Sequence, residues 1–141
     1  MRIRYSVVIP VLFMGFCGVF ILVLYITEQA KREQEQEALA ADKMQKLIRE
    51  EDTSIRGTLR NMDEHLDRND LEGAVSLYQE IRDNISNMYD FADGIPREEW
   101  REQTKRYIAA LEAELERMNE FLVKGDITKA QSVITSIITS R

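Results

Sequence analysis

The chain has 141 residues, room for one modest domain beside a membrane segment, and a formal net charge of −6. All 25 acidic residues follow Thr27, against only 17 basic ones, so this part of the chain would repel the phosphates of a nucleic acid. The single cysteine, Cys17, excludes an intrachain disulfide, a thiolate zinc cluster and a Cys-x-x-Cys-His haem attachment site.

The first predicted element is a membrane helix. From Tyr5 to Ile26 the chain runs 22 residues without a charge. At 1.5 Å per residue, a helix of this length spans roughly the 30 Å hydrocarbon core of a bilayer. The run is longer than the apolar region of a typical signal peptide, and no small-x-small cleavage site follows it. We therefore predict a retained single-pass anchor over residues 1–27.

Small side chains lie midway along this helix, at Gly15, Cys17 and Gly18. Small residues allow two membrane helices to approach closely enough for backbone packing, which is a main source of association in lipid. These three residues are therefore the predicted docking point for other transmembrane subunits of a larger complex.

The orientation of the anchor rests on the charges at its two ends. Arg2 and Arg4 precede the apolar run, whereas Lys31 and Arg32 after it are interleaved with glutamates. Because basic residues favour the cytoplasmic side, we predict a cytoplasmic amino terminus. In a bacterium this places the protein in the inner membrane with its helical domain in the periplasm.

The rest of the chain is predicted to be helical, apart from short connections. Residues 28–43 are polar on all sides, which is typical of a solvated helical stalk. Apolar residues then recur mainly at spacings of three, four and seven, which is the period of a buried helix face. The four predicted stripes are Met44, Leu47, Ile48, Ile55, Leu59, Met62 and Leu66; Leu71, Ala74, Tyr78, Ile81, Ile85, Met88 and Ala92; Trp100, Tyr107, Leu111, Leu115, Met118 and Leu122; and Ile127, Ala130, Ile134, Ile137 and Ile138.

Short connections are predicted at residues 69–70, 93–96 and 125–126. Asp70 and Asp126 suit the N-caps of the second and fourth helices, Pro96 suits the start of the third, and Gly125 suits a left-handed C-cap. Short connections force consecutive helices to run antiparallel. The predicted fold is all-α, a single N-terminal transmembrane helix followed by an up-and-down antiparallel four-helix bundle over residues 44–141.

The third predicted helix ends FLVKGD and is followed by ITKAQSVITSI. This segment looks like the Gly-Asp turn into the final helix of the cytochrome c′ and cytochrome b562 class of periplasmic bundles, which the order of helices over residues 44–141 also resembles. In the covalent-haem members the final helix goes on to a Cys-x-x-Cys-His motif, which is absent here. The resemblance implies a haemless relative associated with electron transfer.

One alternative keeps a cofactor in the bundle. His65 is the only histidine, and with Met88 or Met118 opposite it could give a His/Met site for haem b. In the b562 class, however, the histidine belongs to the last helix, whereas His65 falls on the first helix of the predicted bundle. A solvated histidine among acidic neighbours is the simpler interpretation, with the methionines filling the core. We therefore expect no cofactor.

Catalytic and metal-binding patterns are missing from the sequence. A bundle di-iron site needs Glu-x-x-His on two helices, and only one histidine exists. There is no Gly-x-Ser-x-Gly motif and no Gly-rich phosphate loop. We therefore predict that the protein is not an enzyme and contains no metal.

Two functional hypotheses remain. The first is a non-catalytic, membrane-anchored subunit that docks to and buttresses a larger membrane complex of respiratory or photosynthetic electron transfer, with a basic soluble electron carrier as a further partner of its acidic surface. The second is a carrier of non-covalent haem b or another small ligand. Nucleic acid is not an expected partner.

Overall fold

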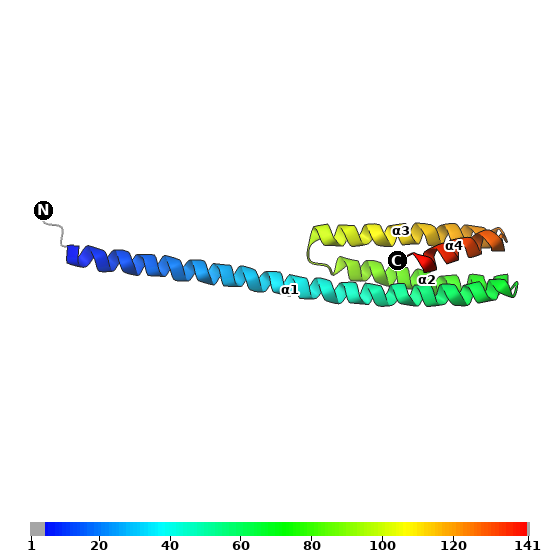
Figure 1. Ribbon diagram of the computed structural model, residues 1–141, viewed down its shortest axis with the longest axis horizontal. Coiled ribbons are helices and arrows are strands. Elements are labelled where there is room, and N and C mark those ends of the chain that lie inside the picture. Colours follow the sequence, from blue (N-terminus) through cyan, green and yellow to red (C-terminus); the bar gives the residue numbers. More distant parts are fainter. Residues whose placement is uncertain (1–4, 141) are drawn as a thin grey trace. The chain divides into compact units, whose positions relative to one another are not determined.

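A computed structural model describes residues 5–140 of the chain, with side chains from Val7 onward. These residues form four α-helices and no strand, which confirms the all-α prediction: α1 Tyr5–Asp67, α2 Leu71–Asp93, α3 Glu98–Val123 and α4 Ile127–Thr139 (Figure 1). The chain divides into two compact units, the first ending at Ala38 and the second beginning at Leu39.

The second unit has one hydrophobic core to which all four helices contribute. The predicted stripes supply most of it, since the spacing of three and four keeps their apolar side chains on one face of each helix. The buried side chains are Ala41, Ile48, Ile55, Leu59, Met62, Leu66, Ala74, Ile81, Ile85, Met88, Ala92, Ile95, Ile108, Leu111, Leu115, Met118, Leu122, Ala130, Val133, Ile134 and Ile137.

The third stripe was predicted incorrectly at one position. Tyr107 is 49% exposed, whereas its neighbour Ile108 is fully buried. The Tyr107 hydroxyl donates a hydrogen bond to Asp52 Oδ1 at 3.2 Å, so the ring lies at the rim with its polar end on a carboxylate. Ile108 carries no polar atom and therefore takes the core position instead.

The turns follow the predicted chemistry, with one shift. Asp70 and Asp126 are N-caps whose side chains accept hydrogen bonds from the backbone N–H groups of Gly73 and Lys129. Gly125 adopts φ +73°, the left-handed conformation predicted for it. The third helix begins at Glu98 rather than at Pro96, because Arg97 is the residue in extended conformation that precedes it.

The two hairpins, α1 with α2 and α3 with α4, repeat the same sequence pattern 56 positions apart. Asp70 corresponds to Asp126, and apolar residues correspond on both sides of the turn without a gap. The matched pairs include Ile55 and Leu111, Leu59 and Leu115, Met62 and Met118, Leu66 and Leu122, Ala74 and Ala130, and Ile81 and Ile137. The two turns thus carry a capping aspartate at matched positions.

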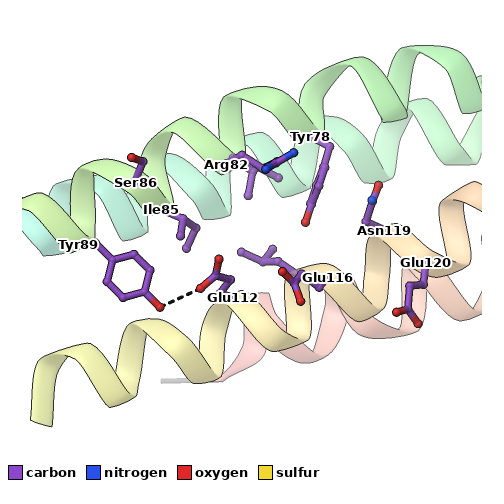
Figure 2. Close-up of a pocket in the computed structure, with 11 residues that line it drawn as sticks. Tyr78, Arg82, Ile85, Ser86, Tyr89, Glu112, Glu116, Asn119 and Glu120 are labelled. Atoms are coloured by element: carbon purple, nitrogen blue, oxygen red, sulfur yellow. Dashed lines mark hydrogen bonds between the residues drawn. The ribbon is translucent and has the colours of Figure 1, made fainter. Parts of the chain in front are cut away.

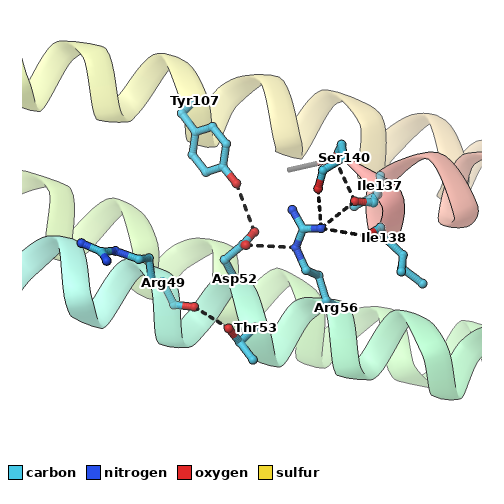
Figure 3. A network of polar contacts seen from close by, with 8 residues as sticks. All are labelled: Arg49, Asp52, Thr53, Arg56, Tyr107, Ile137, Ile138 and Ser140. Atoms are coloured by element: carbon cyan, nitrogen blue, oxygen red, sulfur yellow. Dashed lines mark hydrogen bonds and ion pairs between the residues drawn. The ribbon is translucent and has the colours of Figure 1, made fainter.

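Helix α4 has 13 residues, fewer than the 23 of its counterpart α2 and the 26 of its neighbour α3. Helix α4 therefore runs beside only the C-terminal half of α3 (Figure 1). Its end is held by Arg56 of α1, whose Nη1 donates to the carbonyl oxygens of Ile137 at 2.9 Å, Ile138 at 3.1 Å and Ser140 at 2.7 Å (Figure 3). The guanidinium thus satisfies carbonyl groups that a helix terminus leaves without partners.

Asp52 holds Arg56 in this position. The Arg56 Nε donates to Asp52 Oδ2 at 3.0 Å, and the other oxygen of Asp52 accepts the Tyr107 hydroxyl (Figure 3). One carboxylate therefore connects α1 and α3 and orients the cation that caps α4.

Candidate functional site

The first unit carries an apolar surface that nothing in the described chain covers. From Val7 to Ile26 every side chain is exposed except that of Cys17, which is intermediate. Phe16 is 72% exposed and Leu22 is 57% exposed. By length and composition this part of α1 could cross a membrane. Arg2 and Arg4, on which the predicted orientation depends, lie outside the described residues, as does the side chain of Tyr5.

The predicted docking residues do not all share one face of this helix. At 3.6 residues per turn, Gly15 and Gly18 lie about 60° apart around the axis, whereas Cys17 lies about 160° from Gly15. A Cβ atom built on either glycine would meet no other atom within 4 Å. The two glycines thus form one open, small-residue surface, and Cys17 faces away from it.

The residues of the alternative haem site lie in different surroundings. Met88 and Met118 are fully buried in the core of the second unit. His65 is partly exposed, and its Nδ1 is 2.9 Å from Asp70 Oδ2 at the turn between α1 and α2. Because α1 and α2 run antiparallel from that turn, His65 lies level with the first turn of α2. Met88 is roughly 14 residues farther along α2, which places it about 20 Å from His65 along the helix axis. The structure does not bring His65 and Met88 together.

A groove with polar walls lies between α2 and α3 in the second unit. It has a volume of about 540 Å³. Its floor is apolar, formed by Ile81, Ile85 and Leu115. The walls carry Tyr78, Arg82, Ser86 and Tyr89 from α2 and Glu112, Glu116, Asn119 and Glu120 from α3.

Two tyrosine and glutamate pairs face each other across this groove. The rings of Tyr78 and Tyr89 project from α2 toward α3, and the carboxylates of Glu112 and Glu116 project toward α2 (Figure 2). The Tyr89 hydroxyl donates to Glu112 Oε2 at 2.8 Å. Tyr78 faces the region of Glu116, whose charge acts on its hydroxyl.

Burial and the nearby carboxylates keep both phenols protonated. Burial, followed by the hydrogen bond to Glu112, raises the pKa of Tyr89 to about 12. Burial, followed by the charge of Glu116, also raises the pKa of Tyr78. At neutral pH the groove therefore presents two neutral aromatic rings, three carboxylates and one guanidinium, that of Arg82.

The sequence alone does not predict this groove. Its pattern places Tyr78 in the buried stripe of the second helix and indicates no site at Tyr89 or at the glutamates of α3. The signal present in the sequence is the spacing: Tyr78 and Tyr89 are eleven residues apart, about three helical turns, and Glu112, Glu116 and Glu120 follow at intervals of four. Each spacing places its residues on one face, but only the fold sets the two faces opposite each other.

Comparisons with protein-family models, with curated proteins and with solved structures found no match to this chain.

Proposed function

We propose that this protein is a non-catalytic, membrane-anchored helical subunit that docks to and buttresses a larger membrane complex. The observation that carries the proposal is the apolar surface of Val7–Ile26, which is exposed on all sides in the described chain. An apolar surface of this extent requires lipid or protein around it. In the proposed topology a single transmembrane helix precedes an up-and-down antiparallel four-helix bundle.

The second unit supports a role in assembly rather than in chemistry. Its core is filled by apolar side chains from all four helices, and the part of the chain after Thr27 has an excess of acidic over basic residues. An acidic surface attracts basic partners over long range. We propose that this unit lies in the periplasm of a bacterium, with the amino terminus in the cytoplasm.

The proposed setting is an electron-transfer complex of respiration or photosynthesis, with a basic soluble electron carrier as a second partner. This part of the proposal rests on the resemblance of residues 44–141 to the cytochrome c′ and cytochrome b562 class and on the acidic surface.

The docking surface within the membrane is testable by adding bulk to one face of the helix. Gly15→Leu combined with Gly18→Leu keeps the segment apolar but prevents close approach of a second helix. The double variant should insert into the membrane normally and keep its helicity by circular dichroism, yet lose its partner during purification in mild detergent.

Cys17→Leu is the matched control, because Cys17 lies on the other side of the same turn. This variant should co-purify with the partner at full yield. If the double glycine variant also retained its partner at full yield, docking through the membrane helix would be refuted. If Cys17→Leu released the partner as well, the surface would be wrongly assigned.

A further inference from the structure

We propose that the groove between α2 and α3 binds a linear aliphatic diamine or polyamine through its two tyrosine and glutamate pairs. The inference is independent of the proposed docking of the membrane helix, because it concerns a different surface. It rests on the shape of the groove, on the kind of groups that line it and on their spacing.

Each tyrosine and glutamate pair supplies what an ammonium group needs. A carboxylate accepts charge-assisted hydrogen bonds from the ammonium protons, and the face of an aromatic ring attracts a cation. In the first pair the Tyr89 hydroxyl occupies Glu112 Oε2 at 2.8 Å, which leaves Glu112 Oε1 for a ligand. In the second pair Tyr78 and Glu116 lie across the groove from each other (Figure 2).

The spacing of the carboxylates fits two ammonium groups on one short chain. Glu112 and Glu116 are four residues apart on α3, which corresponds to a rise of about 6 Å. An extended four-carbon spacer holds two ammonium nitrogens at a similar separation. The floor of Ile81, Ile85 and Leu115 then lies under the methylene groups, which gain from burial against an apolar surface.

The charge of the groove selects a cation, and its geometry favours an organic one. Three carboxylates face a single guanidinium, that of Arg82. Among the described residues no group of three or more possible ligands is arranged to hold a metal ion. Arg82 is exposed and carries the same charge as an ammonium group. It therefore repels a cationic ligand and weakens its binding at this site.

The test is titration calorimetry on the full chain in mild detergent at fixed ionic strength. The probes are butane-1,4-diamine, spermidine, n-butylamine as a monocation with the same carbon chain, and Mg²⁺. The two polyvalent amines should bind at least about tenfold more tightly than n-butylamine, since a second charge-assisted contact is worth about one order of magnitude in affinity. Mg²⁺ added at the same concentration of positive charge should not displace the two polyvalent amines.

Three variants test the residues. Glu116→Gln should weaken diamine binding about tenfold, because it removes one carboxylate. Arg82→Gln should strengthen it, because it removes the opposing charge. Glu114→Gln changes the same charge on α3 outside the groove and should leave binding unaltered; Glu114 pairs with Arg117 on the surface.

The proposal is overturned if neither polyvalent amine binds, or if n-butylamine or Mg²⁺ binds as well as the diamine. It is also overturned if Glu114→Gln weakens binding as much as Glu116→Gln, because the effect would then be that of net charge alone. Loss of binding in Arg82→Gln would instead indicate a ligand with an anionic group and would refute a diamine. Circular dichroism of each variant verifies that helicity is retained.

Discussion

The two hairpin turns of the second unit share one plan but close in different ways. In the first, the Asp70 cap also contacts His65, with Asp70 Oδ2 2.9 Å from the ring Nδ1. In the second turn Phe121 takes the position of His65, and Lys129 contacts both Phe121 and the capping Asp126. Its Nζ lies 3.6 Å from Asp126 Oδ2 and 5.7 Å from the centroid of the Phe121 ring.

The residue three positions after the capping aspartate reflects this difference. At Gly73 an added Cβ would lie against Asp70 Oδ2 and 2.8 Å from His65 Nδ1, whereas the corresponding position in the second turn carries Lys129. Histidine and glycine therefore occur together in the first turn, and phenylalanine and lysine together in the second. The single histidine of the chain therefore belongs to the first turn, where it contacts the capping Asp70.

The largest expected difference between the hairpins lies in their cores. Ile81 and Ile137 occupy matched positions and are 0% and 4% exposed. Ile81→Ala should lower the free energy of unfolding by about 3 to 4 kcal/mol, because α2 continues on both sides of it and the cavity cannot collapse. Ile137→Ala should lower it by about 2 kcal/mol, because it lies near the end of α4.

Chemical denaturation of the full chain in mild detergent, followed by circular dichroism, measures both changes. Gln79→Ala is the control, since Gln79 is exposed on α2 and should change the free energy by about 0.5 kcal/mol or less. Equal losses for Gln79→Ala and Ile81→Ala would show that α2 does not bury this face.

The next effect separates two glycines of the first hairpin. Gly57 lies inside α1 with open space where a Cβ would go, so Gly57→Ala should raise the free energy of unfolding by about 0.5 to 1 kcal/mol. Gly73→Ala should instead lower the melting temperature, because the new methyl group displaces Asp70 from its cap. A melting temperature that rose in both variants would contradict the role given to Gly73.

The Gly73 variant also has a defined pH dependence. The hydrogen bond from the Gly73 N–H, and then the contact with His65, lower the pKa of Asp70. A carboxyl whose pKa is lower in the folded state stabilises the fold above its unfolded pKa, and this contribution is lost as the pH falls through the folded pKa. The difference in melting temperature between wild type and Gly73→Ala should therefore narrow in acid, below about pH 4.

The smallest expected effect is a coupling between positions 65 and 73. Gly73→Lys alone should destabilise the first turn, and adding His65→Phe should recover part of the loss, because the pair then matches Phe121 and Lys129 of the second turn. A double-mutant cycle should give a favourable coupling of about 0.5 to 1 kcal/mol. Additive effects of the two substitutions would mean that the turns differ for another reason.

Much of the fold follows from local patterns that the sequence displays. The stripes predicted the buried residues of α2 almost completely, and the two aspartates predicted both caps, since a cap depends on a few adjacent residues. Local patterns could not decide which of Tyr107 and Ile108 is buried, because either residue suits the apolar face of a helix. The choice depends on the hydrogen bond from Tyr107 to Asp52, which is 55 positions away in the sequence.

The groove depends on pairings that no single segment contains. Tyr89 and Glu112 lie on different helices, and the turn at residues 94–97 determines which residues of α2 and α3 become neighbours. Their spacing within each helix was visible, but the register between the helices was not. The capping of α4 by Arg56 was not visible either, because Arg56 and Ile137 are 81 positions apart in the sequence.

The shortness of α4 has a consequence for how the second unit opens. A free helix of 13 residues is marginal in water, so α4 depends on its contacts with α1 and α3 for its own helicity. Its contacts with α1 join distant parts of the chain, as in the Gln131 Nε2 to Asp67 Oδ1 hydrogen bond at 2.7 Å. Segments with few buried contacts open locally at a lower free energy than the central helices of a core. Amide hydrogens of α4 should therefore exchange with solvent sooner than those of α2, and the opening begins at the carbonyl groups that Arg56 holds.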